Sequence, residues 1–183
     1  MKIKLFLKNL IYRMRETYTV EQLVKMGLTV GENFNPQLGT TLDPSHCWLI
    51  TIGDDVTMAP NVQVLAHDAS TFKGLGYTRI GRVEIGNRVF VGAGTIILPN
   101  VVIGNDVVIG AGSVVTHSIE SGMVCAGNPA RVICTREEFI NKHKEKMKQL
   151  PVYDESYTLR GNITEEKKKE QKEALNNHGG YVI

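Results

Sequence analysis

The sequence predicts an all-β fold in which short strands wind into a stacked coil with three flat sides. Aliphatic residues recur at every sixth position: Ile85, Val91, Ile97, Ile103, Ile109 and Val115. The next residue is usually glycine, as in Gly86, Gly92, Gly104 and Gly110. An α-helix would repeat near 3.6 residues and an ordinary strand near 2, so a period of six indicates neither.

Each six-residue unit is expected to form one side of the coil, a short strand and a turn, with its aliphatic residue pointing inward. Glycine is expected after it because glycine relieves the backbone at the corner. Three sides make an 18-residue coil, which predicts three stacked pairs: Ile85 with Ile103, Val91 with Ile109, and Ile97 with Val115. One coil alone could not bury its apolar face, so several are needed.

The repeat is interrupted once. Residues 52–64 carry the same period, but Val64 and Ile85 are 21 residues apart, which is not a multiple of six. We therefore predict a loop over residues 65–84, and a polar excursion from a regular scaffold is a common place for function. His67 lies near its start, and an imidazole can accept and release a proton near neutral pH.

The run at residues 85–133 reads IGNRVFVGAGTIILPNVVIGNDVVIGAGSVVTHSIESGMVCAGNPARVI. It resembles the hexapeptide-repeat acyltransferases, and most closely the sugar and capsular polysaccharide O-acetyltransferases. The resemblance covers about residues 20–135. It implies a left-handed parallel β-helix, a homotrimer with sites at the subunit interfaces, and acetyl-CoA as cosubstrate.

The resemblance also assigns roles to particular residues. His67 occupies the position of the general base, and Asp68 is a candidate to orient its ring. Acceptor contacts are implied for three residues: Asp43, His46 and Phe90. Cofactor contacts are implied for five others: Ala93, Ala111, Thr116, His117 and Arg131. The five histidines include no closely spaced pair on the coils, so we expect no metal.

Three segments are predicted along the chain. Residues 1–28 form an N-terminal helical segment, in which Thr19 and Gln22 make a capping box for a short helix. Residues 29–134 form the β-helix, and residues 135–183 a helical extension. The basic and apolar N-terminus lacks the long apolar core of a signal peptide, and we expect at most a peripheral membrane contact.

Composition narrows the class of protein. The chain of 183 residues is 42% hydrophobic and 22% charged, which suits a folded domain. A formal net charge of +2 gives no reason to expect nucleic acid as a partner. Three cysteines without a Cys-x-x-Cys motif argue against a disulfide framework and for the cytoplasm.

The expected function is therefore acetyl transfer from acetyl-CoA to a sugar hydroxyl, in surface polysaccharide biosynthesis, with His67 as the general base. Alternatives within the enzymes are an N-acetyltransferase acting on an amino-sugar nucleotide and an antibiotic acetyltransferase. A non-enzymatic alternative is a β-helix scaffold with a vestigial site. The sequence leaves open the acceptor, the pathway, the acyl chain and the role of the C-terminal tail.

Overall fold

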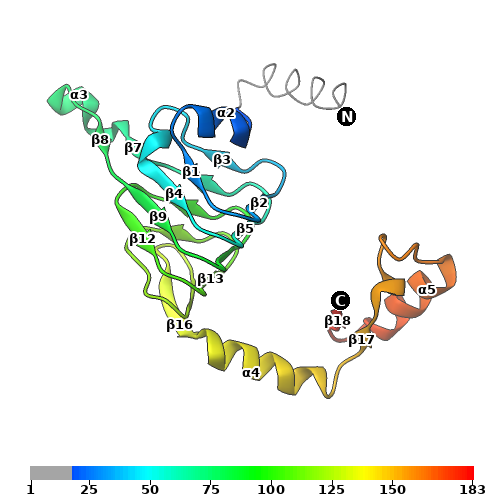
Figure 1. The fold of residues 1–183 in the computed structure, drawn as a ribbon. Coiled ribbons are helices and arrows are strands. Elements are labelled where there is room, and N and C mark those ends of the chain that lie inside the picture. Colours follow the sequence, from blue (N-terminus) through cyan, green and yellow to red (C-terminus); the bar gives the residue numbers. More distant parts are fainter. Residues whose placement is uncertain (1–17) are drawn as a thin grey trace, which may run out of the picture. The chain divides into compact units, whose positions relative to one another are not determined.

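The computed structural model describes residues 18–183 (Figure 1). Most of the N-terminal segment predicted over residues 1–28 therefore lies outside the described residues. The chain divides into two compact units, the first ending at Arg136 and the second spanning Glu137–Ile183. The first unit holds the stacked strands, and the second is mainly helical.

The strands of the first unit form three sheets, and the chain visits the sheets in turn. The first sheet contains β1 (Thr29–Val30), β4 (Ile50–Ile52), β9 (Val83–Ile85) and β12 (Val101–Ile103). The second contains β2 (Asn35–Pro36), β5 (Thr57–Met58), β10 (Phe90–Val91), β13 (Val108–Ile109), β15 (Met123–Ala126) and β16 (Arg131–Thr135). The third contains β3 (Thr41–Leu42), β6 (Gln63–Val64), β11 (Ile96–Ile97) and β14 (Val114–Val115).

The register confirms the predicted stacking. All three expected pairs are Cα partners in parallel strands: Ile85 with Ile103, Val91 with Ile109, and Ile97 with Val115. These six side chains are at most 2% exposed, so they form a continuous apolar column. The β15–β16 pair is antiparallel and forms a hairpin at the C-terminal end of the stack.

The corner glycines are explained by close approach between coils. The backbone N–H of Asp54 donates to Oδ1 of Asn87 at 2.8 Å, and that of Asn87 donates to Oδ1 of Asn105 at 2.7 Å. A Cβ on Gly53 would lie 2.2 Å from Oδ1 of Asn87, and one on Gly86 would lie 2.6 Å from Oδ1 of Asn105. Gly53 and Gly86 do not have positive φ. The expected reason for glycine, freedom of the backbone, is therefore wrong here, and space is the cause.

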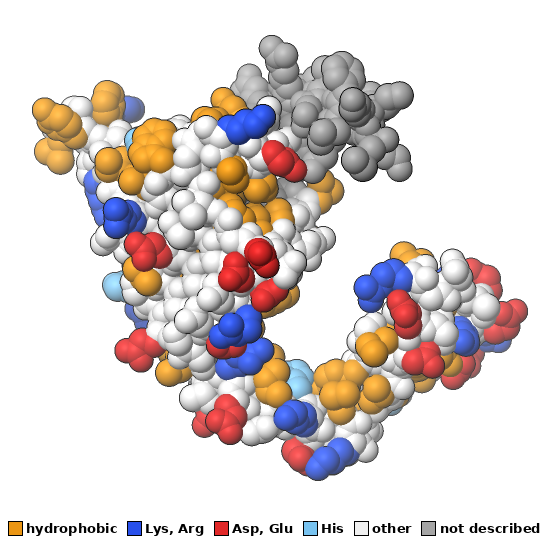
Figure 2. Space-filling model, in the orientation of Figure 1, with side chains coloured by type: hydrophobic (Ala, Val, Ile, Leu, Met, Phe, Trp, Pro, Cys, Tyr) orange, Lys and Arg blue, Asp and Glu red, His pale blue; other side chains and the backbone are white. Residues whose placement is uncertain are grey.

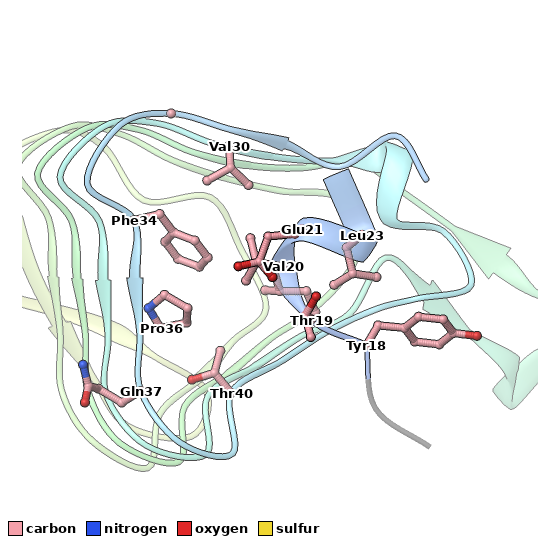
Figure 3. A pocket seen from close by; sticks show the side chains of 12 residues that line it. Tyr18, Thr19, Val20, Glu21, Leu23, Val30, Phe34, Pro36, Gln37 and Thr40 are labelled. Carbon is pink, nitrogen blue, oxygen red and sulfur yellow. The ribbon is translucent and has the colours of Figure 1, made fainter. Parts of the chain in front are cut away.

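Helix α2 (Val20–Lys25) begins at the predicted capping box. The Thr19 side chain accepts from the N–H of Gln22, and the Gln22 side chain accepts from the N–H of Thr19. Leu23 is 2% exposed and packs into the core of the stack. A pocket of about 430 Å³ opens between α2 and the first coil, with Phe34 and Thr40 on its wall (Figure 3).

The second unit continues helix α4 (Arg136–Met147) and adds a small parallel pair, β17 (Val152–Tyr153) with β18 (Tyr181–Val182). The 3₁₀ turn η3 (Glu155–Tyr157) and helix α5 (Glu165–Ala174) lie between these two strands in the chain. Nδ1 of His143 lies 2.8 Å from the hydroxyl of Tyr181, which links α4 to β18. Among residues 18–183, no helix is both long enough and apolar enough to cross a membrane.

Candidate active site

The interruption of the repeat forms an arm that leaves the coil after β6. Strand β7 (His67–Asp68) pairs antiparallel with β8 (Arg79–Ile80), with η2 (Ala69–Thr71) and α3 (Phe72–Leu75) between them (Figure 1). Hydrophobic side chains gather at the tip of the arm (Figure 2). His67 lies at its base, directly after the buried Ala66, and its side chain is 34% exposed. The structure thus holds His67 against the rigid coil and leaves part of its ring accessible.

Asp43 is brought beside His67 by the parallel pairing of two coils. Leu42 at the end of β3 is the register partner of Val64 at the end of β6, so the residues that follow them lie side by side. Oδ2 of Asp43 is bonded to Nδ1 of His67 and accepts the backbone N–H of Ala66 at 2.9 Å. The Asp43 side chain is completely buried.

The surroundings of Asp43 favour its ionised form. Burial by itself raises the pKa of this carboxyl, but hydrogen bonds from His67, Ala66 and Ser45 outweigh that effect and hold the pKa below its ordinary value of 3.8. An ionised carboxylate can only accept hydrogen bonds. Nδ1 of His67 must therefore carry the proton, which leaves Nε2 of the neutral ring with its lone pair free to act as a base.

Two expected roles change as a result. Asp43 was expected to contact the acceptor, but its buried carboxylate is occupied by His67, Ala66 and Ser45, so it orients His67 instead. Asp68 was the candidate for that orienting role, yet its Oδ1 accepts the N–H of Ser70 at 2.9 Å and its Oδ2 faces Arg79. Asp68 therefore stabilises the arm rather than the imidazole.

The sequence did contain a signal for the Asp43–His67 pair. Val30, Pro36 and Leu42 are spaced by six residues, the same period that runs through residues 52–64. Extending the repeat back by one coil would have stacked Leu42 on Val64 and put Asp43 beside the start of the loop. The irregular segment after Leu42 lengthens this coil to 22 residues and hides the match.

Aromatic rings extend from His67 across the neighbouring segment. The ring of His46 lies 5.4 Å from that of His67 and 5.3 Å from that of Trp48, measured between centroids. Trp48 begins in the 3₁₀ turn η1 (Cys47–Leu49), and its side chain is 55% exposed. His46 was expected to contact the acceptor, and that role stays a prediction. The structure adds Trp48 as an exposed ring in the same row.

The predicted cofactor residues lie on other parts of the coil. Ala93 and Ala111 are exposed, and the N–H of Gly112 donates to the carbonyl of Ala93 at 2.8 Å, which confirms that successive coils stack at this ridge. Oγ1 of Thr116 lies 2.7 Å from Nδ1 of the exposed His117. Small exposed residues leave room for an extended ligand along the ridge.

Arg131 and Phe90, the remaining predicted residues, lie on the second sheet. Arg131 begins β16 and is exposed, and Phe90 begins β10 and is 45% exposed. Within the described part of the chain, neither these two nor the ridge residues share a hydrogen bond, ion pair or ring contact with His67. The structure of one chain thus brings together Asp43, His46 and His67, and keeps the cofactor set apart.

Comparison with known proteins follows from this geometry. Residues 82–117 match the bacterial transferase hexapeptide family, described as six repeats. The chain belongs to the hexapeptide-repeat family. A maltose O-acetyltransferase from Clostridium difficile 630 is 37% identical, with a TM-score of 0.51, over 60% of this chain and 59% of that one.

Two further solved structures are similar to this hexapeptide-repeat protein. A galactoside acetyltransferase in complex with coenzyme A is 34% identical, with a TM-score of 0.55, over 61% of this chain and 58% of that one. A polySia-specific acetyltransferase is 27% identical, with a TM-score of 0.51, over 58% and 50%. The chain therefore matches half to three fifths of the length of these relatives.

Proposed function

We propose that this protein transfers an acetyl group from acetyl-CoA to a sugar hydroxyl, with His67 as the general base. The observation that carries the proposal is the His67–Asp43 pair, in which a buried carboxylate fixes the tautomer of a partly exposed imidazole. The similar solved structures are acetyltransferases of sugars and saccharides, and one of them holds coenzyme A. The family also supports a left-handed winding of the coil.

The chemistry requires one proton relay and no covalent enzyme intermediate. Nε2 of His67 removes the proton from the acceptor hydroxyl as its oxygen attacks the thioester carbon. A C–O bond forms, the C–S bond breaks, and the imidazolium returns the proton to the departing CoA thiolate. Asp43 stabilises the transient positive charge on His67, and backbone N–H groups stabilise the oxyanion.

Acetyl-CoA is proposed to lie along the exposed ridge at Ala93 and Ala111, where small side chains allow its pantetheine arm to approach the backbone. Arg131 is a permanent cation that suits a phosphate group, and His117 and Thr116 add hydrogen-bonding groups. We place the complete site between subunits of a homotrimer, where His67 of one chain meets the ridge of the next. The three free cysteines fit a reducing, cytoplasmic setting.

The acceptor is proposed to be a saccharide of a surface polysaccharide, bound over the rings of His46 and Trp48. Aromatic rings offer a flat apolar face with polar groups at its edge, which suits the mixed character of a pyranose. Phe90, also half-exposed, would contribute from the cofactor side of the interface. Any membrane contact would be peripheral.

Calorimetric titration of acetyl-CoA into the purified protein tests this proposal first. Saturable binding, followed by acceptor-dependent CoA release on a panel of maltose, methyl β-D-galactopyranoside and oligosialic acid, is the expected result. A thiol-reactive dye measures the release. No binding of acetyl-CoA would contradict the transferase and favour the scaffold, whereas release with an amino sugar alone would favour N-acetylation. Sedimentation as a monomer would contradict the shared site.

A further inference from the structure

We propose that Asp43, His46 and His67 also form a binding site for a divalent transition-metal ion such as Zn²⁺, and that the bound ion inhibits acetyl transfer. One ligand atom from each of the three side chains lies within 4.8 Å of the other two. The binding stands on this geometry alone, while the inhibition rests on the proposed function of His67.

The pairing of His46 with His67 overturns the reason for expecting no metal. The two residues are 21 positions apart in the sequence, and the histidine pattern of the coils gave no close pair. The structure nevertheless brings their rings to 5.4 Å between centroids, because the segment after Leu42 and the base of the arm meet at the same edge of the stack.

His46 carries a polar atom that the fold leaves unsatisfied. Its Nδ1 is buried and, among residues 18–183, has no hydrogen-bond partner. A buried nitrogen without a partner costs about 1–3 kcal/mol of desolvation. A metal ion or a proton-donating ligand at this point would remove that cost, so the orphan nitrogen is a second sign of a binding site.

The donor set selects the class of ion. Two imidazoles and one carboxylate, with a fourth position open, form the usual ligand set of Zn²⁺ in accessible sites, whereas Mg²⁺ and Ca²⁺ prefer oxygen ligands. Zn–N bonds of about 2.0–2.1 Å require ligand atoms about 3.4 Å apart, so the rings must close by about an ångström. The partial exposure of His67 provides both the room and the entry path.

Binding and catalysis would then exclude each other. His67 cannot remove a proton from the acceptor while its ring is a metal ligand, and Asp43 cannot hold the His67 tautomer while it coordinates the ion. The ion therefore acts as a reversible inhibitor rather than as a cofactor.

The chain offers a direct optical readout. Trp48 is its single tryptophan, and its ring lies 5.3 Å from that of His46. A paramagnetic ion bound at this site quenches tryptophan fluorescence at short range. Tag-free protein freed of metal with EDTA should be titrated with Ni²⁺ by fluorescence and with Zn²⁺ by calorimetry, as the wild type and as His46→Gln. His178→Gln, which changes an exposed histidine of the second unit, is the matched control.

We expect saturable quenching and about one Zn²⁺ per chain in the wild type and in His178→Gln, and at least tenfold weaker binding in His46→Gln. Equal binding by all three proteins, or no binding by any, would overturn the site. In the same samples, Zn²⁺ should slow CoA release in proportion to occupancy. Occupied protein with full activity would overturn the inhibition alone. Binding by a protein without transferase activity would leave the site intact and remove the proposed function.

Discussion

The carboxylate of Asp43 is hydrogen-bonded to Nδ1 of His67, although 24 residues separate them in the sequence. Parallel pairing of β3 with β6 creates this relationship, because both residues follow strands in the same register. The base and its orienting group are therefore fixed by the most regular part of the fold. The predictions below follow from that placement.

Asp43→Asn should lower kcat for CoA release by about two to four orders of magnitude. The amide keeps the size of the side chain but loses the charge, and it can donate to Nδ1 and so favour the wrong tautomer of His67. Steady-state kinetics measure the effect, with the KM for acetyl-CoA expected to stay close to that of the wild type. Asp68→Asn is the control, since Asp68 faces Ser70 and Arg79, and its kcat should change little.

Asp43 should also make stability depend on pH in the acid range. Its pKa in the folded protein lies below the ordinary value of 3.8, so the unfolded chain binds its proton first as the pH falls. The stability that it contributes is complete above the ordinary pKa and is lost as the pH falls through the folded pKa. Urea unfolding between pH 5 and pH 2 should therefore show a shallower pH dependence for Asp43→Asn than for the wild type. Parallel curves would show that Asp43 is not held in its ionised form.

Trp48→Ala should raise the KM for a saccharide acceptor about tenfold or more, while the KM for acetyl-CoA stays unchanged. Stacking of an apolar sugar face on an aromatic ring contributes about 1–2 kcal/mol, which corresponds to this factor. Trp48→Phe keeps a ring and should recover most of the affinity. The thermal midpoint should change little in both variants because the side chain is 55% exposed. A KM for the acceptor that ignores both substitutions would remove Trp48 from the site.

Gly86→Ala should destabilise the coil by about 1–3 kcal/mol. The new Cβ would lie 2.6 Å from Oδ1 of Asn105 and 2.8 Å from the carbonyl carbon of Gly104, so the bond from Asn105 to the backbone of the coil before it must break or shift. Gly74→Ala in α3 is the matched control. A Cβ there meets nothing within 4 Å, and alanine suits a helix better than glycine, so its stability should be equal or slightly higher. Equal effects of the two variants would contradict the close-packing account of the corner.

The sequence predicted the fold further than the site. The six-residue period was sufficient to place Ile85 under Ile103 and to mark residues 65–84 as an excursion, because inward-facing positions of a repeat are set by spacing alone. It was not sufficient to find the partner of His67. That partner depends on how far the irregular segment after Leu42 lengthens one coil, which no local pattern records.

The glycines show the same limit at the level of single residues. Their positions could be predicted from the repeat, yet the reason for them could not. Gly53 and Gly86 serve to admit Asn87 and Asn105 from the next coil, and such contacts between coils appear only once the register is known.

The most direct test of the central claim is the rate of CoA release by His67→Ala at saturating acetyl-CoA and acceptor. The account predicts that this variant binds acetyl-CoA as tightly as the wild type by calorimetry and releases CoA at least a hundredfold more slowly. Release at the wild-type rate by a folded variant would contradict the assignment of His67 as the general base.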